Sequence, residues 1–162
     1  MIAGVILAAG DSSRMGFPKQ LAEYKGKTIL ETVIDTVNKS FSETLVVLGH
    51  ENDTITEKLD FKESTILINE NWEEGIVSSI RTALFYLSDN KEIHSAMIFM
   101  ADQPSVNSKI IEKLVNIKNY LLSVNPPILR KSILSQLPEF KKFLPSYINL
   151  IPGISSGVIF KY

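Results

Sequence analysis

The sequence predicts an α/β fold in which helices pack on both faces of a mostly parallel β-sheet. Along about the first 120 residues, apolar runs rich in β-branched residues alternate with segments of helical periodicity, which is typical of βαβ units. The first run, Ile2–Ala8, is continuously apolar, as expected for a strand covered on both faces. The length of 162 residues suits one domain, so we expect a three-layer α/β/α domain over residues 1–162.

The remaining elements follow from periodicity and turn residues. Thr28 is expected to cap a helix whose apolar face is formed by residues 29, 30, 33, 34 and 37. A strand at 44–48, a helix at 53–59 and a strand at 65–68 come next. A helix at 76–87, expected to turn Ile76, Ile80 and Leu87 inward, precedes a strand at 96–100 and a helix at 108–121. Prolines interrupt the rest, where we expect a helix at 131–137 and strands at 147–150 and 158–161.

Composition excludes several classes of function. The 17 basic and 18 acidic residues give a net charge of −1, which argues against a nucleic-acid-binding protein. The absence of Cys excludes disulfides, zinc–thiolate sites and a cysteine nucleophile. No apolar run approaches the roughly 20 residues that span a bilayer. We therefore expect no membrane partner and a cytoplasmic location.

The segment that carries chemistry is Leu7-Ala8-Ala9-Gly10-Asp11-Ser12-Ser13-Arg14-Met15-Gly16-Phe17-Pro18-Lys19-Gln20-Leu21, at the carboxyl end of the first strand. Open α/β sheets place their ligands at this edge. Small residues allow close approach of the backbone, and a positive φ at Gly10 would turn successive N–H groups into one concavity. Arg14 and Lys19 add two cations. Phosphate binding is favoured over a tight turn with two surface cations.

Two rival motifs fail. Gly10 and Gly16 lack the G-x-G start of the dinucleotide fingerprint. Gly26-Lys27-Thr28 is similar to the end of a P-loop, but no strand directly precedes it, and a turn followed by a helix cap explains it better. His50 and His94 have no second histidine at metal-ligand spacing.

The segment 7–21, followed by Gly26-Lys27-Thr28-Ile29-Leu30, resembles the opening of the nucleotidyltransferases with a GT-A-like, Rossmann-related fold. Its Arg-Met-Gly and Pro-Lys-Gln-Leu sequences are most similar to those of the molybdenum cofactor cytidylyltransferases. Two more segments strengthen this resemblance. Residues 71–81, Asn-Trp-Glu-Glu-Gly-Ile-Val-Ser-Ser-Ile-Arg, resemble the nucleotide-recognition segment, and Ala101-Asp102-Gln103-Pro104 resembles the metal-binding turn.

The resemblance implies a role for each matching residue. Arg14 and Lys19 would hold a triphosphate, and Asp102 would bind Mg²⁺, so these three are the expected catalytic residues. Gly49 would leave room near the base. The other expected nucleotide-binding residues are Leu7, Ala8, Ala9 and Gly10 through backbone atoms, and Asn71, Gly75 and Ser79 around the base and ribose.

The C-terminal part departs from that family. The strand and glycine-rich loop expected after the Asp-Gln-Pro turn are missing, and Lys161 stands where a second metal-binding Asp is expected. The resemblance implies transfer of CMP from CTP to a phosphate-bearing small molecule such as molybdopterin, with release of pyrophosphate and with a molybdoenzyme or accessory protein as a further partner. Two alternatives stay open: a degenerate nucleotide-binding homologue acting through a partner protein, and a sugar-phosphate nucleotidyltransferase.

Overall fold

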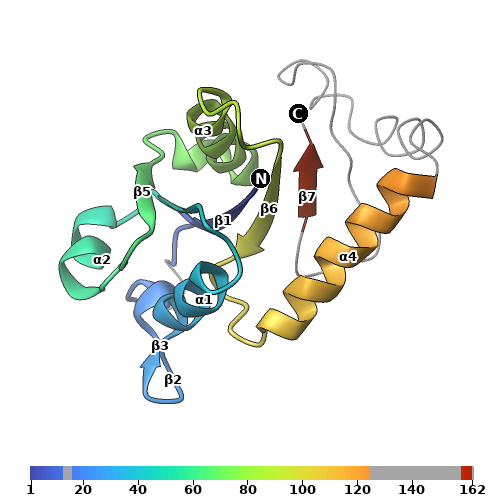
Figure 1. Cartoon of the computed structure of the whole chain (residues 1–162). Helices are drawn as coiled ribbons and strands as arrows, with labels where there is room; N and C mark the ends of the chain where they lie inside the picture. Colours follow the sequence, from blue (N-terminus) through green and yellow to red (C-terminus); the bar gives the residue numbers. More distant parts are fainter. Residues whose placement is uncertain (13–15, 125–157, 162) are drawn as a thin grey trace.

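A computed structural model describes residues 1–12, 16–124 and 158–161 of the chain. Its central sheet has the strand order β5-β4-β1-β6-β7 (Figure 1). The strands are β1 (Ile2–Ala8), β4 (Thr44–Leu48), β5 (Thr65–Ile68), β6 (Ser95–Met100) and β7 (Val158–Lys161). The first four run parallel and β7 pairs antiparallel with β6, which confirms the mostly parallel α/β fold.

Helices cover both faces of this sheet. Side chains of β1 alternate between two apolar clusters, as a strand requires. One cluster joins Ile6 and Ala8 to α1 (Ile29–Asn38), α2 (Asn52–Lys58) and α4 (Ser108–Val124). The other joins Ala3, Val5 and Leu7 to α3 (Ile76–Ser88). Ile76, expected to face inward, is 50% exposed, because Ser78 and Ser79 make the buried contacts in the first turn of α3.

The segment that was compared with a P-loop is a β-hairpin and a helix cap. The strands β2 (Glu23–Tyr24) and β3 (Lys27–Thr28) pair antiparallel around Lys25 and Gly26, whose φ angles of 53° and 82° suit a two-residue turn. Thr28 then caps α1: its hydroxyl accepts a hydrogen bond from Glu31 N, and the Glu31 carboxylate accepts one from Thr28 N. The hairpin conformation confirms that this segment is no P-loop.

Two ion pairs link α1 to β3 and to the turn before β5. The Asp35 carboxylate, 17% exposed, accepts hydrogen bonds from Lys27 on β3, at 2.5 Å, and from Lys62 before β5. Burial alone would raise the pKa of Asp35, but the hydrogen bonds and charges of the two lysines together hold it below its ordinary value. The charged form of Asp35 is therefore the one that the fold stabilises.

The expected helix at 131–137, the expected strand at 147–150 and Arg14 lie outside the described residues. Among the described helices, none combines the length and the apolar character that crossing a membrane requires.

Candidate functional site

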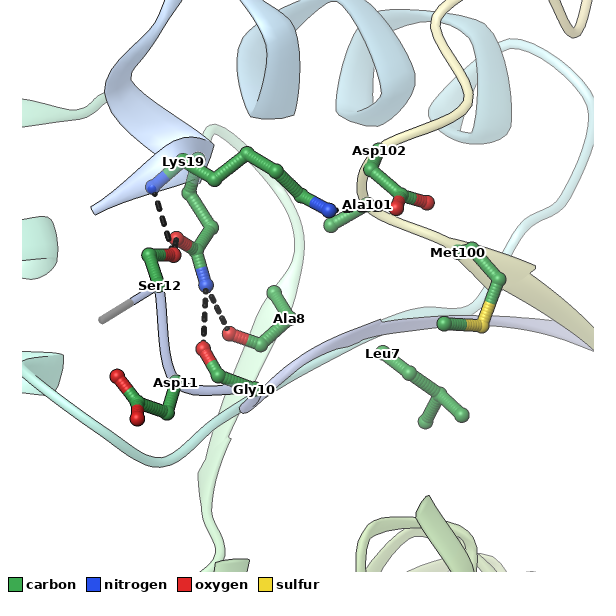
Figure 2. Close-up of a pocket in the computed structure, with 10 residues that line it drawn as sticks. Leu7, Ala8, Gly10, Asp11, Ser12, Lys19, Met100, Ala101 and Asp102 are labelled. Carbon is green, nitrogen blue, oxygen red and sulfur yellow. Dashed lines mark hydrogen bonds and ion pairs between the residues drawn. The ribbon is translucent and has the colours of Figure 1, made fainter. Parts of the chain in front are cut away.

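The carboxyl ends of β1 and β6 meet at one edge of the sheet. Leu7 pairs with Met100 across the two strands, and Ala101 N donates to Leu7 O at 3.1 Å. A cavity of about 420 Å³ opens at this edge (Figure 2). It is lined by Leu7, Ala8, Gly10, Asp11, Ser12, Lys19, Gln20, Met100, Ala101 and Asp102. The topology thus places the loop after β1 opposite the turn after β6, as open α/β sheets do with their ligand sites.

In the loop after β1, the backbone carbonyl groups and the backbone N–H groups differ in their hydrogen bonding. The carbonyl oxygens of Ala8 and Gly10 accept hydrogen bonds from the Gln20 side-chain amide, at 2.6 and 3.5 Å. The carbonyl of Ala9 accepts from His50 N at 3.2 Å. The backbone N–H groups of Gly10, Asp11 and Ser12, in contrast, donate to no residue in the described part of the chain. Successive unused donors beside a cavity are suited to an anion.

The structure does not show the positive φ angle considered for Gly10. Among the described glycines, positive φ angles occur at Gly16, Gly26 and Gly75. Apart from its two chain neighbours, a Cβ atom added at Gly10 would meet no atom of the described residues within 4 Å. Packing within the described residues therefore does not require glycine here. Because glycine has no side chain, the backbone at the cavity wall stays accessible to a ligand.

Two opposite charges face each other across the cavity. Lys19, in the short 3₁₀ helix η1 (Lys19–Leu21), places its Nζ 2.6 Å from Asp102 Oδ2, and Figure 2 shows the two side chains pointing toward one another. Their side chains are 44% and 39% exposed, so both stay reachable from solvent. A ligand bearing phosphate groups can take Lys19 from this pair, and a cation can take Asp102.

A second carboxylate lies at the same cavity. Asp11 Oδ1 is 3.7 Å from His50 Nε2, and the imidazole ring packs 4.7 Å from the ring of Trp72, centroid to centroid. Within the described ranges, no group of three or more acidic or histidine side chains has the arrangement of a metal site. The cavity wall thus offers two carboxylates, Asp11 and Asp102, that could contribute a ligand to a divalent ion. Such an ion would complete its coordination with phosphate oxygens and water, as Mg²⁺ does in many nucleotide sites.

Gly49 serves close packing. A Cβ added there would lie 2.6 Å from Trp72 Cβ and 2.8 Å from Ala9 O. Close packing of the protein itself therefore requires glycine at this position. The glycine allows Ala9, after β1, and Trp72, after β5, to pack closely against the chain at the end of β4.

The segment after β5 is held by a buried amide. Asn69, 2% exposed, donates to the hydroxyls of Ser78 and Ser79 at 2.8 and 3.0 Å and accepts a hydrogen bond from Asn71 N at 3.0 Å. The Ser78 hydroxyl in turn donates to Gly75 O at 2.7 Å. Ser79 is therefore engaged inside the protein, whereas Asn71 is exposed. Gly75 has a φ of 89°, a conformation that favours glycine.

The structure thus brings together part of the expected site. Leu7, Ala8, Gly10, Lys19 and Asp102 line one cavity, whereas Ala9 and Gly49 are not part of its lining and lie close to each other. Asn71, Gly75 and Ser79 belong to the neighbouring segment. Sequence reasoning missed five lining residues, Asp11, Ser12, Gln20, Met100 and Ala101, although all five lie within or beside the segments it selected.

Comparisons with known proteins match about the first 120 residues of the chain to one family. The profile of the "MobA-like NTP transferase domain" matches residues 4–120. The bifunctional protein GlmU of Francisella tularensis subsp. holarctica (strain OSU18) is 32% identical over 119 residues, which are 72% of this chain and 25% of that protein. The nicotine blue oxidoreductase of Paenarthrobacter nicotinovorans is 28% identical over 119 residues, 70% of this chain and 55% of that one. The matched region thus covers 25% of the first relative and 55% of the second.

Solved structures share the fold. Rv0371c from Mycobacterium tuberculosis H37Rv superposes with a TM-score of 0.65 at 25% identity, covering 72% of this chain and 59% of that chain. The same protein has also been solved in complex with manganese, with a TM-score of 0.62 at 24% identity and the same coverage of both chains.

Proposed function

Because the chain belongs to the family of MobA-like NTP transferase domains, we propose that it binds a nucleoside triphosphate in this cavity and transfers the nucleotidyl group to a phosphate-bearing small molecule. The observation that carries the proposal is the convergence of three features on one cavity. These are the unused N–H groups of residues 10–12, the Lys19 ammonium and the Asp102 carboxylate. Together they offer what a polyphosphate and its counterion need.

The proposed reaction needs no side-chain nucleophile. A phosphate oxygen of the acceptor attacks the α-phosphorus of the triphosphate, a new P–O bond forms, and the bond from the α-phosphorus to the bridging oxygen breaks. Pyrophosphate leaves with that electron pair. Transfers of this kind depend on positioning and on neutralising negative charge. Lys19 and the backbone donors of the loop would supply both, with Arg14, which lies outside the described residues, as a further cation.

The donor set at the cavity fits a divalent cation that is shared with the substrate. Asp102 offers a solvent-accessible carboxylate oxygen at the cavity wall, and Lys19 is its partner. Mg²⁺, when bound, would supply positive charge to the phosphate oxygens. Binding of the metal at Asp102 would release Lys19 for the phosphates, so the two binding groups become available together.

CTP as the nucleotide and molybdopterin as the acceptor are supported by the segments 7–21, 71–81 and 101–104, which are similar to molybdenum cofactor cytidylyltransferases. The relative named as an oxidoreductase shows that similarity over this region does not fix the reaction. A sugar phosphate as the acceptor, and a binder without turnover that acts through a molybdoenzyme or another partner protein, are the competing outcomes of the test.

The test is thermal unfolding with CTP, GTP, ATP or UTP, each with and without Mg²⁺. A nucleotide at 100 times its Kd should add about 2.7 kcal/mol of stability, which raises Tm by about 5–10 °C for a chain of this size. A magnesium-dependent shift with CTP, followed by release of pyrophosphate when molybdopterin is added, is the expected result. A shift that does not depend on magnesium favours the binder without turnover. The absence of any shift contradicts the proposal.

A further inference from the structure

Gln20 is buried in an unusual way for its residue type. Glutamine is mostly exposed in proteins, yet Gln20 is only 6% exposed. It belongs to the same 3₁₀ helix as Lys19, and its amide points toward the loop after β1. The dashed lines that end on the carbonyl groups of Ala8 and Gly10 in Figure 2 mark its hydrogen bonds.

The hydrogen-bond network fixes the orientation of this amide. Lys19 N donates to Ser12 Oγ at 2.9 Å, so the Ser12 hydroxyl proton is left to donate to Gln20 Oε1, at 3.4 Å. With its oxygen directed to Ser12, Gln20 turns both N–H bonds toward the carbonyl oxygens of Ala8 and Gly10. Because His50 N holds the intervening carbonyl of Ala9, three successive acceptors are tied into the protein.

We propose that Gln20 is a positioning residue that keeps the carbonyl side of the loop after β1 turned away from bound phosphates, so that the N–H groups of residues 10–12 face them. This inference rests on the proposed function. It assigns to Gln20 no contact with the ligand. Its role is to determine that backbone N–H groups, and not carbonyl groups, face the cavity. A carbonyl oxygen that faces a phosphate repels it, whereas an N–H group attracts it.

Two substitutions separate the hydrogen bonds from the bulk of the side chain. Gln20→Met keeps the length and fills the same space, but it donates to neither carbonyl. Gln20→Glu keeps the shape and the acceptor for Ser12 but places carboxylate oxygens against the carbonyl oxygens of Ala8 and Gly10. We expect Gln20→Met to weaken phosphate binding by about tenfold, the equivalent of one to two net hydrogen bonds, and Gln20→Glu to weaken it further.

The probe is inorganic pyrophosphate with Mg²⁺, because it reports on the phosphate-binding part of the cavity without a base. Calorimetric titration of the full chain gives the Kd, and ¹⁵N–¹H spectra follow the amides of Gly10, Asp11 and Ser12. In the wild-type protein these three amide signals should shift on titration, and in Gln20→Met the shifts should be small even at saturation. A general loss of stability would not single out these amides.

Ile93→Ala is the matched control. Ile93 is 2% exposed and precedes β6 at the end of the sheet opposite to the cavity, so its truncation destabilises the core without touching the loop. Its Kd for pyrophosphate should equal that of the wild-type protein. Should it weaken binding as much as Gln20→Met does, the loss in both variants reflects stability, and the inference is overturned.

The remaining outcomes are distinguishable. If Gln20→Met binds within twofold of the wild-type protein, the positioning role is wrong and the proposed function stands. If the wild-type protein binds neither pyrophosphate nor any nucleotide, both fail. If the Gln20 variants do not fold, Ser12→Ala takes their place, because it removes the hydroxyl that orients the amide. A Ser12→Ala Kd two- to fivefold above that of the wild-type protein supports the inference, and an unchanged Kd overturns it.

Discussion

Replacing Asp102 with asparagine separates the two interactions that meet at the cavity. The Asp102 carboxylate lies 2.6 Å from Lys19 Nζ, and the two side chains are 39% and 44% exposed. Ion pairs this accessible to water contribute about 0.2–1 kcal/mol. Asp102→Asn should therefore lower Tm by no more than about 2–4 °C.

The same substitution releases Lys19 for the phosphates. Without magnesium, a triphosphate no longer competes with Asp102 for the ammonium group, and its affinity should rise by up to about fivefold, which corresponds to the upper limit of about 1 kcal/mol for the pair. With magnesium, the additional affinity seen in the wild-type protein should disappear, because the carboxylate that would bind the ion is gone. The variant is thus expected to bind CTP slightly better without Mg²⁺ and worse with it.

Calorimetric titration of CTP in EDTA and in Mg²⁺ measures both effects on one sample. Asp11→Asn is the matched control, since Asp11 is the other acidic residue that lines the cavity, and it lies 3.7 Å from His50 instead of beside Lys19. Asp11→Asn should keep the full magnesium increment. If Asp102→Asn keeps this increment and Asp11→Asn loses it, the metal assignment belongs to Asp11 and the reasoning about Asp102 is refuted.

Three further predictions concern stability. Gly49→Ala forces a Cβ into the close contact with Trp72 and Ala9 and should lower the free energy of unfolding in urea by about 1–3 kcal/mol; an unchanged midpoint would show that the loops separate freely. Asn69→Ala should cost about 1–3 kcal/mol in the same assay, because the buried Ser79 hydroxyl loses its hydrogen-bond partner, whereas Ser78 keeps its bond to Gly75 O. The exposed Asn71→Ala is its control and should stay within about 0.5 kcal/mol. Since the folded pKa of Asp35 is lowered, its charged form stabilises the fold above the unfolded pKa of about 3.9, and this stabilisation is lost as pH falls through the folded value. The stability difference between wild type and Asp35→Asn should thus shrink below about pH 4, and a difference that stays constant from pH 7 to pH 2 would contradict this.

The sequence predicted the sheet well because its signals are local. The apolar runs at Ile2–Ala8, Thr44–Leu48 and Thr65–Ile68 have the same bounds in the structure. Thr28 caps α1 as expected, through a pair of contacts only three residues apart. Because parallel strands carry their carboxyl ends to one edge, the sequence could also predict that Lys19 and Asp102 approach each other.

What the sequence could not predict are the roles that depend on long-range contacts. Gln20 and Asn69 belong to polar loop segments, and nothing in their neighbourhood marks them as buried. Their burial follows from how the loops after β1 and β5 pack at the same edge. Gly49 illustrates the same limit: nothing in its neighbourhood along the chain marks the close contact with Trp72 and Ala9 that requires glycine there. At this site, the residue type alone does not distinguish a side chain that contacts a ligand from one that supports the loops around the cavity.

That distinction bears on how the protein would choose its nucleotide. In the proposed function, Lys19 and the N–H groups of the loop after β1 contact phosphates, which all nucleoside triphosphates share, so these groups would not select a base. In the segment after β5, the buried hydroxyls of Ser78 and Ser79 accept hydrogen bonds from Asn69, so both already have a protein partner. The exposed Asn71 is available. Asn71→Ala should therefore change the ratio of the Kd values for CTP and GTP while leaving the Kd for pyrophosphate unchanged, as calorimetry would show. An equal loss of affinity for CTP and for pyrophosphate would show that Asn71, like Asn69, supports the structure of the site and does not contact the base.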